Sequence, residues 1–242
     1  MITTEEFKKQ NEELIQDEII SQNRCQLEIF ADKIYKQILN NKLYEIDKFN
    51  GSQGFQLIHN GKSYVKHDIQ GIYVTYLVSI LNGQPICLYV GETDNEIDQR
   101  LGRLIKQAKG EQHPTESHSG GQLLFDKFTD KGRQDIWEKN LRVQFITLDD
   151  IKINLGGTAF SITNLEGIEY RVIREFSNKK LLHLFENEMI DRLAPISNKN
   201  CQSYNNHNEY ENNWKLFNDL CDFVEKDLKK TNLKEKKFNI VK

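Results

Sequence analysis

The sequence predicts an α+β fold: a small antiparallel three-stranded sheet flanked by helices, with helical additions at the N- and C-terminal ends. Residues 71–91 contain two apolar segments joined by a turn, which indicates two antiparallel strands, and residues 137–148 alternate as a third strand does. Residues 93–109 and 178–195 each place apolar side chains at helical spacing. These observations define the expected sheet and the two helices beside it.

The composition is that of a globular chain that can bury an ordinary core. The chain has 242 residues and a mass of 28.4 kDa, with 38% hydrophobic and 29% charged residues, which suits one sizeable domain with appendages. No apolar run approaches the length needed to span a bilayer, and residues 1–18 are too polar for a secretory signal. We therefore expect a soluble protein with a cytoplasmic location.

The cysteines are scattered and form no C-x-x-C pair. Zinc sites and disulfide frameworks normally show close cysteine spacings, so neither is expected. We expect reduced, mostly structural thiols at Cys25, Cys87, Cys201 and Cys221.

The charge balance is unusual for a protein that binds nucleic acid, because the formal net charge is −3. Its distribution is uneven: basic and acidic residues number seven and ten over residues 1–50, seven and four over residues 100–133, and seven and three over residues 225–242. A basic face is one interpretation of this asymmetry, and solvated charged helices are the other.

Residues 1–66 are interpreted as an N-terminal helical arm followed by a short hairpin or loop. Apolar side chains recur at near-helical spacing over residues 3–48, and we expect two helices with a break near residues 21–24. Glycines and an asparagine surround two apolar residues between positions 50 and 64, which is typical of a turn. We interpret this region as a packing or dimerisation arm rather than a catalytic one.

The central hairpin has its expected strands at residues 73–80 and 86–90, both rich in β-branched and aromatic residues. The Asn-Gly dipeptide at 82–83 tolerates the positive φ of a hairpin turn. The first strand begins with Gly-Ile-Tyr at 71–73, and the second ends with Tyr-Val-Gly at 89–91. Two phenols and two glycines are therefore expected at matching points on neighbouring strands.

Thr93 and Asp94 are the candidate N-caps of the helix after the hairpin. The apolar side chains of this helix that should face inward are Ile97, Leu101, Leu104 and Ile105, and its other faces carry Arg100, Arg103, Lys106 and Lys109. Residues 110–133 are interpreted as an insertion loop that carries His113 and His118 and is long enough to reach out from the core.

The last third of the chain contains one clear helix. Residues 149–164 are expected to be a glycine-containing excursion, and residues 165–176 fit a helix or a strand, of which we favour the helix. The clear helix ends at Pro195, and its apolar face comprises Leu181, Leu182, Phe185, Met189, Ile190 and Leu193. Residues 201–242 are interpreted as a polar loop, an amphipathic helix over 214–228 and a basic tail.

The two tripeptides at 71–73 and 89–91 resemble the signature tripeptides of the GIY-YIG nuclease family, with Val90 in place of the second isoleucine. In that family an arginine follows on the first helix, and Arg100 is the best match, with Arg103 one turn later in reserve. The resemblance extends over residues 69–200.

A later helix carries the second half of the resemblance. The family's metal-binding glutamate is followed by an aliphatic residue, a proline and an asparagine, and Glu186, Ile190, Pro195 and Asn198 fall into this register. Glu188 would point to a different face of the helix and is the weaker candidate for the metal ligand.

The chain departs from the family at one position. Many members have a histidine or tyrosine one turn after the arginine, where this chain has Leu104. The corresponding polar function must be absent or supplied from elsewhere, and His118 is the candidate substitute.

The resemblance implies a divalent-metal-dependent endonuclease that hydrolyses phosphodiester bonds in DNA. Tyr73 would orient or deprotonate the attacking water and Tyr89 would share its network, although their roles are interchangeable. Arg100 would hold the scissile phosphate. Glu186 would be the chief ligand of Mg²⁺, with Mn²⁺ as a possible substitute. Asn198 would support the site by hydrogen bonding.

The arrangement of the chain favours one branch of the family. We interpret residues 67–200 as a nuclease core with insertions and residues 201–242 as a C-terminal loop, helix and basic tail, without a separate recognition module. This arrangement is similar to type II-like restriction endonucleases, which cut double-stranded DNA, can act as homodimers and have a companion DNA methyltransferase. The alternatives are a structure-selective or phage-directed nuclease and a catalytically inactive DNA-binding member.

Overall fold

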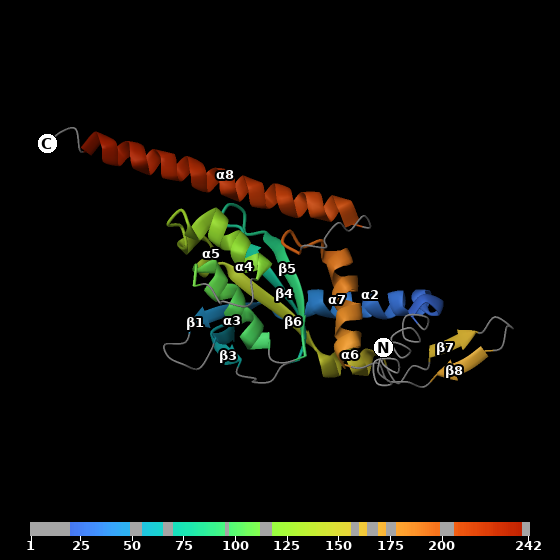
Figure 1. Cartoon of the computed structure of the whole chain (residues 1–242). Coiled ribbons are helices and arrows are strands. Elements are labelled where there is room, and N and C mark those ends of the chain that lie inside the picture. Colours follow the sequence, from blue (N-terminus) through green and yellow to red (C-terminus); the bar gives the residue numbers. More distant parts are fainter. Residues whose placement is uncertain are drawn as a thin grey trace, which may run out of the picture.

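The computed structural model describes residues 20–48, 55–64, 70–94, 97–111, 118–155, 160–163, 169–172, 178–198 and 206–238 (Figure 1). The strands are β1 (Tyr44–Lys48), β2 (Phe55–His59), β3 (Lys62–Tyr64), β4 (Gly71–Val78), β5 (Pro85–Thr93), β6 (Leu141–Thr147), β7 (Phe160–Thr163) and β8 (Glu169–Val172). The helices are α2 (Arg24–Asn40), α3 (Ile97–Ala108), α4 (Ser119–Leu124), the π-helix η1 (Phe125–Thr129), α5 (Asp135–Glu138), α6 (Leu148–Leu155), α7 (Asn178–Leu193) and α8 (His207–Phe238).

The main sheet has six strands in the order β3-β2-β1-β6-β4-β5, and all its neighbouring strands are antiparallel. The α+β class is confirmed, but the expected sheet of three strands is wrong. Residues 44–48, which were expected to be helical, form β1, and Tyr44 pairs with Val143 of β6. The β2-β3 hairpin then extends the sheet. Pairing with β1 covers the backbone of β6 that a three-stranded sheet would leave at an open edge.

The central β4-β5 hairpin forms as expected, with Tyr73 opposite Gly91 and the turn at Gly83 in the left-handed region at φ 72°. The pairing is irregular at one point. Thr75 pairs with Tyr89 but Tyr76 pairs with Cys87, so Leu88 is an additional residue on β5. Such bulges bend a strand and re-aim its side chains.

Helices cover both faces of the central strands (Figure 1). On one face, Ile72, Val74 and Tyr76 of β4 belong to a buried cluster that includes side chains of α2 and α7. On the other, Tyr73 packs with Ile97 of α3, among others. Burial on both faces explains why apolar residues do not alternate with exposed polar ones along β4, where even Thr75 is buried.

The segment after α7 runs along β5, the last strand of the sheet. Ile196 N–H donates to the carbonyl of Cys87 (3.1 Å) and Ser197 N–H donates to that of Leu88 (3.0 Å). Because β5 has no strand neighbour on this side in the described sheet, these bonds satisfy edge groups and fix α7 beside β5. Ala194, at φ 47°, makes the sharp turn out of the helix.

The expected helices α3 and α7 are confirmed, whereas three other expectations are wrong. Within residues 110–133, α4 and η1 replace the expected loop, because Leu124 and Phe128 are completely buried. Residues 169–172 form β8, which pairs with β7, instead of a helix. The third strand begins at Leu141, after the short helix α5.

Helix α8 begins at His207, inside the segment expected to be a loop, and continues past residue 228. Its asparagine-rich start is stabilised by tertiary contacts: the buried Asn213 side chain donates to the carbonyls of Leu193 and Ala194 (3.2 Å each) and accepts from Cys87 N–H (3.3 Å). These bonds satisfy carbonyls at the C-terminal end of α7. Such contacts between distant segments are not predicted by the periodicity of the sequence. No helix in the described part of the chain combines the length and apolarity needed to cross a bilayer.

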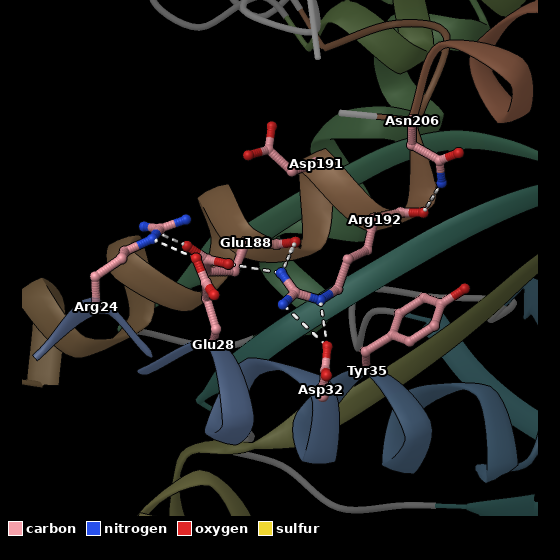
Figure 2. Close-up of a pocket in the computed structure, with 8 residues that line it drawn as sticks. All are labelled: Arg24, Glu28, Asp32, Tyr35, Glu188, Asp191, Arg192 and Asn206. Atoms are coloured by element: carbon pink, nitrogen blue, oxygen red, sulfur yellow. Dashed lines mark hydrogen bonds and ion pairs between the residues drawn. The ribbon is translucent and has the colours of Figure 1, made fainter. Parts of the chain in front are cut away.

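Ion pairs join α7 to α2 around a polar pocket, shown in Figure 2. The Glu188 carboxylate, 6% exposed, accepts from Arg24 (2.8 Å) and Arg192 (2.6 Å), and Arg192 also donates to Asp32 of α2. Other residues lining the pocket are Glu28, Tyr35, Asp191 and Asn206. Glu188 therefore serves to fix α7 against α2.

Candidate functional site

Tyr73 and Tyr89 lie on the α3 side of the hairpin, with ring centroids 6.0 Å apart. Tyr73 is 1% exposed and Tyr89 is partly exposed. A Cβ atom at Gly91 would lie 2.7 Å from the Tyr73 hydroxyl and 2.6 Å from the Tyr89 ring. Glycine is required at position 91 because the two phenol rings occupy the space of a side chain.

The other signature glycine, Gly71, has a different role. A Cβ atom there would collide with the carbonyl oxygen of Ile146 on β6. Gly71 therefore allows β4 and β6 to approach closely at the end of the sheet where the tyrosines lie.

His118 joins the tyrosines from the start of α4. Its Nε2 lies 3.3 Å from the Tyr73 hydroxyl, and its ring is centred 4.4 Å from that of Tyr89. The Gly120-Gly121 pair permits this approach: Cβ atoms there would press on Tyr89 and on the backbone of Leu104, respectively. Two glycines that suggest a loop in the sequence thus allow a helix to pack tightly.

Burial determines the protonation of this group. It lowers the pKa of His118 from 6.5 to about 4, with Arg100 and Arg103 adding to the effect, so the imidazole is neutral at pH 7. Burial also raises the pKa of Tyr73 well above its ordinary value, reinforced by Tyr89 and Glu186 and opposed by Arg100. Tyr73 is therefore a neutral phenol at pH 7.

Arg100 projects its charge into the site from the first turn of α3. The pKa values of Tyr73, Tyr89 and Glu92 are each raised, mainly by burial, and Arg100 is among the causes that lower all three. Among the described residues, the Arg100 side chain has no ion-pair partner. A half-buried guanidinium without a carboxylate partner is suited to hold an anionic group.

Glu186 lies on α7 beside two further ligand-type residues, Glu92 at the end of β5 and His183 one turn earlier on α7. One donor atom from each of the three lies within 4.8 Å of the others. His183 Nδ1 is 3.3 Å from a Glu186 carboxylate oxygen. The buried Oε2 of Glu92 has no hydrogen-bond partner in the described chain. Two carboxylates and an imidazole fit a divalent cation.

The Glu92 carboxylate destabilises the charged form of Glu186. Burial raises the pKa of Glu186, and the nearby Glu92 raises it further, while His183 and a hydrogen bond from the backbone of Glu92 oppose the shift. Burial likewise raises the pKa of Glu92, with Asp94 adding to it. A cation between the two carboxylates would relieve this repulsion.

Asn198 holds the strand that carries Tyr89 and Glu92. Val90 N–H donates to Asn198 Oδ1 (3.0 Å), and Asn198 Nδ2 donates to the Val90 carbonyl (2.8 Å). The side chain thereby takes the place of a neighbouring strand at the edge of β5. Both bonds are to the backbone of Val90, so the contribution of Asn198 is to position β5 relative to α7.

The structure brings together most of the side chains that the sequence suggested. Tyr73, Tyr89, Arg100, His118 and Glu186 are linked by contacts or electrostatic interactions.

The remaining candidates lie apart from that group or contribute less directly. Arg103 acts on His118 through its charge, and Leu104 is buried in the core. Glu188 lies on the α2 side of α7, and His113 lies outside the described residues.

Sequence reasoning missed Glu92 and His183. Each had a local signal: Glu92 directly follows the Tyr-Val-Gly tripeptide, and His183 precedes Glu186 by three residues, which places both on one helix face. Comparison of the chain with protein-family models, with curated proteins and with solved structures found no match in any of the three.

Proposed function

We propose that this protein is a divalent-metal-dependent endodeoxyribonuclease of the GIY-YIG type. The observation that carries the proposal is that a Tyr-Tyr-His group, the guanidinium of Arg100 and a carboxylate-imidazole cluster converge at one end of the β4-β5 hairpin. Phosphodiester hydrolysis needs a group that accepts a proton from water, a cation for the phosphate and stabilisation of the leaving oxygen. Together, the three groups offer side chains for these tasks.

Tyr73 and His118 form the proton-accepting part of the proposed site. A neutral phenol is a poor base, but the Tyr73 hydroxyl can donate its proton to Nε2 of the neutral His118 while its oxygen accepts a proton from the attacking water. The water thereby becomes hydroxide without a free phenolate at Tyr73. Contact with His118 favours Tyr73 over Tyr89 for this role, and Tyr89 packs against the His118 ring.

Arg100 and the metal cluster would act on the phosphate. The Arg100 guanidinium would bind the non-bridging oxygens and hold the phosphate in line with the water. Glu186, with Glu92 and His183, would hold the ion. A bound Mg²⁺ ion would supply charge stabilisation for the phosphate and the departing 3′ oxygen.

The substrate we propose is double-stranded DNA, and the function a sequence-specific, restriction-type one. One such site cuts one strand, so a double-strand break requires a homodimer or successive nicks. A companion DNA methyltransferase would protect the host sites.

Cleavage of supercoiled plasmid with and without Mg²⁺ tests this proposal. The wild-type protein should nick or linearise the plasmid only with the ion. Glu186→Gln and Arg100→Gln should each slow cleavage by about 10²–10³-fold, since each removes a charge that the transition state requires. The matched controls are Glu211→Gln, a carboxylate also paired with a histidine but on exposed α8, and Lys106→Gln on the exposed face of α3.

Wild-type cleavage rates in Glu186→Gln would refute the proposed site. DNA binding without any cleavage by the wild-type protein would identify a catalytically inactive binding member. Sequencing of the fragment ends separates the remaining possibilities: one fixed site supports restriction, whereas cutting only at branched or damaged DNA identifies a structure-selective nuclease.

A further inference from the structure

We propose that Glu92, His183 and Glu186 form a three-ligand metal centre that binds a first-row transition-metal ion in preference to Mg²⁺. The inference rests on the proposed function only for the use made of the ion, because the binding itself can be measured without DNA. A site whose only protein ligand is one glutamate would lack a nitrogen donor, and so could not favour a transition-metal ion over Mg²⁺ in this way.

The first support is the position of the three donors. They come from the end of β5 and from one face of α7, two elements that the Ile196–Asn198 segment holds together. Metal bonds of about 2.0–2.2 Å place donor atoms roughly 3–4 Å apart. The observed upper limit of 4.8 Å is slightly wider, and His183 is 60% exposed, so its ring has room to close on an ion.

The second support is the buried Oε2 of Glu92, which lacks a hydrogen-bond partner among the described residues. A buried carboxylate oxygen without a partner is costly, and native structures normally satisfy it with a donor, a water or an ion. The Glu186 ligand atom lies within 4.8 Å of a Glu92 carboxylate oxygen, but an ionised carboxylate only accepts hydrogen bonds and therefore offers this oxygen no hydrogen. A cation shared by both carboxylates would satisfy the Glu92 oxygen.

The third support is the chemistry of His183. Mg²⁺ prefers oxygen ligands and keeps several of its waters, whereas imidazole nitrogen is a good ligand for first-row transition ions. The imidazole already faces the Glu186 carboxylate, with Nδ1 3.3 Å from the oxygen. The nitrogen donor therefore favours transition ions, while the two carboxylates serve either kind of ion.

Mn²⁺ titration followed by electron paramagnetic resonance tests the inference, because the signal of free Mn²⁺ falls as the ion binds. The wild-type protein should bind one Mn²⁺ per chain, and Mg²⁺ should displace it only in large excess. His183→Ala should weaken Mn²⁺ binding by about tenfold or more while leaving Mg²⁺ affinity, measured by calorimetry, within about twofold. Glu92→Gln should weaken both ions.

The matched control is His207→Ala, which removes an exposed histidine that pairs with Glu211 on α8, and it should bind Mn²⁺ as the wild type does. Circular dichroism would verify that each variant is folded. Equal Mn²⁺ affinity in His183→Ala and wild type, or displacement of Mn²⁺ by an equal concentration of Mg²⁺, would overturn the inference. If either result overturned the inference, unchanged plasmid cleavage by His183→Ala in Mg²⁺ would still support the proposed nuclease function.

Discussion

Two carboxylates on α7, Glu186 and Glu188, lie two residues apart in the sequence and in opposite surroundings. Glu188 is bound by Arg24 and Arg192 in the ion-pair network between α2 and α7 (Figure 2). Glu186 faces Glu92 instead, and burial together with that neighbour raises its pKa. One carboxylate is neutralised by the protein, and the other is held beside a like charge.

The difference teaches that burial by itself does not identify a functional carboxylate. Glu188 is the more buried of the two, with 6% exposure against 14%, yet its surroundings satisfy it. Glu186 lies where two carboxylates cost stability unless a cation joins them. An unfavourable arrangement that the fold maintains is the stronger sign of a binding site.

The largest expected effect on stability comes from Glu188. Glu188→Ala should lower the free energy of unfolding by about 3 kcal/mol, because it leaves Arg192 and Arg24 without their buried partner. Urea denaturation followed by circular dichroism measures this. Glu186→Ala is the matched comparison and should change stability by no more than about 0.5 kcal/mol, or increase it, because it removes repulsion with Glu92. Equal losses of unfolding free energy in the two variants would contradict the contrast drawn between Glu186 and Glu188.

His118 should make stability depend on pH. Its pKa of about 4 in the folded protein lies below the ordinary 6.5, so the unfolded chain binds more protons between these values and stability is lost as the pH falls from 6.5 toward 4. The groups facing the ring are Tyr73, Tyr89, Arg100 and Arg103.

The contribution of His118 should be about 2 to 3 kcal/mol between pH 7 and pH 4.5. It is measured as the difference in unfolding free energy between the wild type and His118→Gln, which cannot titrate, at both pH values. Subtraction removes the contribution of carboxylates that titrate in both proteins. Parallel stability curves for the two proteins would show that His118 is not a buried neutral group.

Asn198 should have the smallest effect. Asn198→Ala removes two hydrogen bonds to the backbone of Val90 and should cost about 1–2 kcal/mol. Hydrogen exchange should quicken at the Val90 amide, which loses its acceptor. Asn212→Ala, on the exposed face of α8, is the control and should alter neither quantity. Unchanged exchange at Val90 would contradict the assigned role.

Much of the hairpin and of the two expected helices followed from local pattern. β-Branched and aromatic residues on either side of an Asn-Gly turn located β4 and β5, and helical spacing located α3 and α7. The register on α7 separated Glu186 from Glu188. The larger sheet did not follow, because β1 is held in place by pairing with β6, nearly a hundred residues away in sequence. Helix α4 was also missed, since its glycines indicate a loop unless the surfaces they fit are known.

The sequence by itself determined that two tyrosines lie near the same end of one hairpin, because the turn fixes which strands pair and roughly which residues face one another. The bulge at Leu88, which brings Tyr89 to the same face of the sheet as Tyr73, was decided by the tertiary structure. The tertiary structure alone decided which groups join them. His118 was a candidate only as a residue of an expected loop, and Glu92 was not predicted. Their positions beside Tyr73 and Glu186 depend on how α4 and α7 pack against β5. Packing between distant segments sets the protonation and partners of a side chain, and local sequence does not encode those contacts.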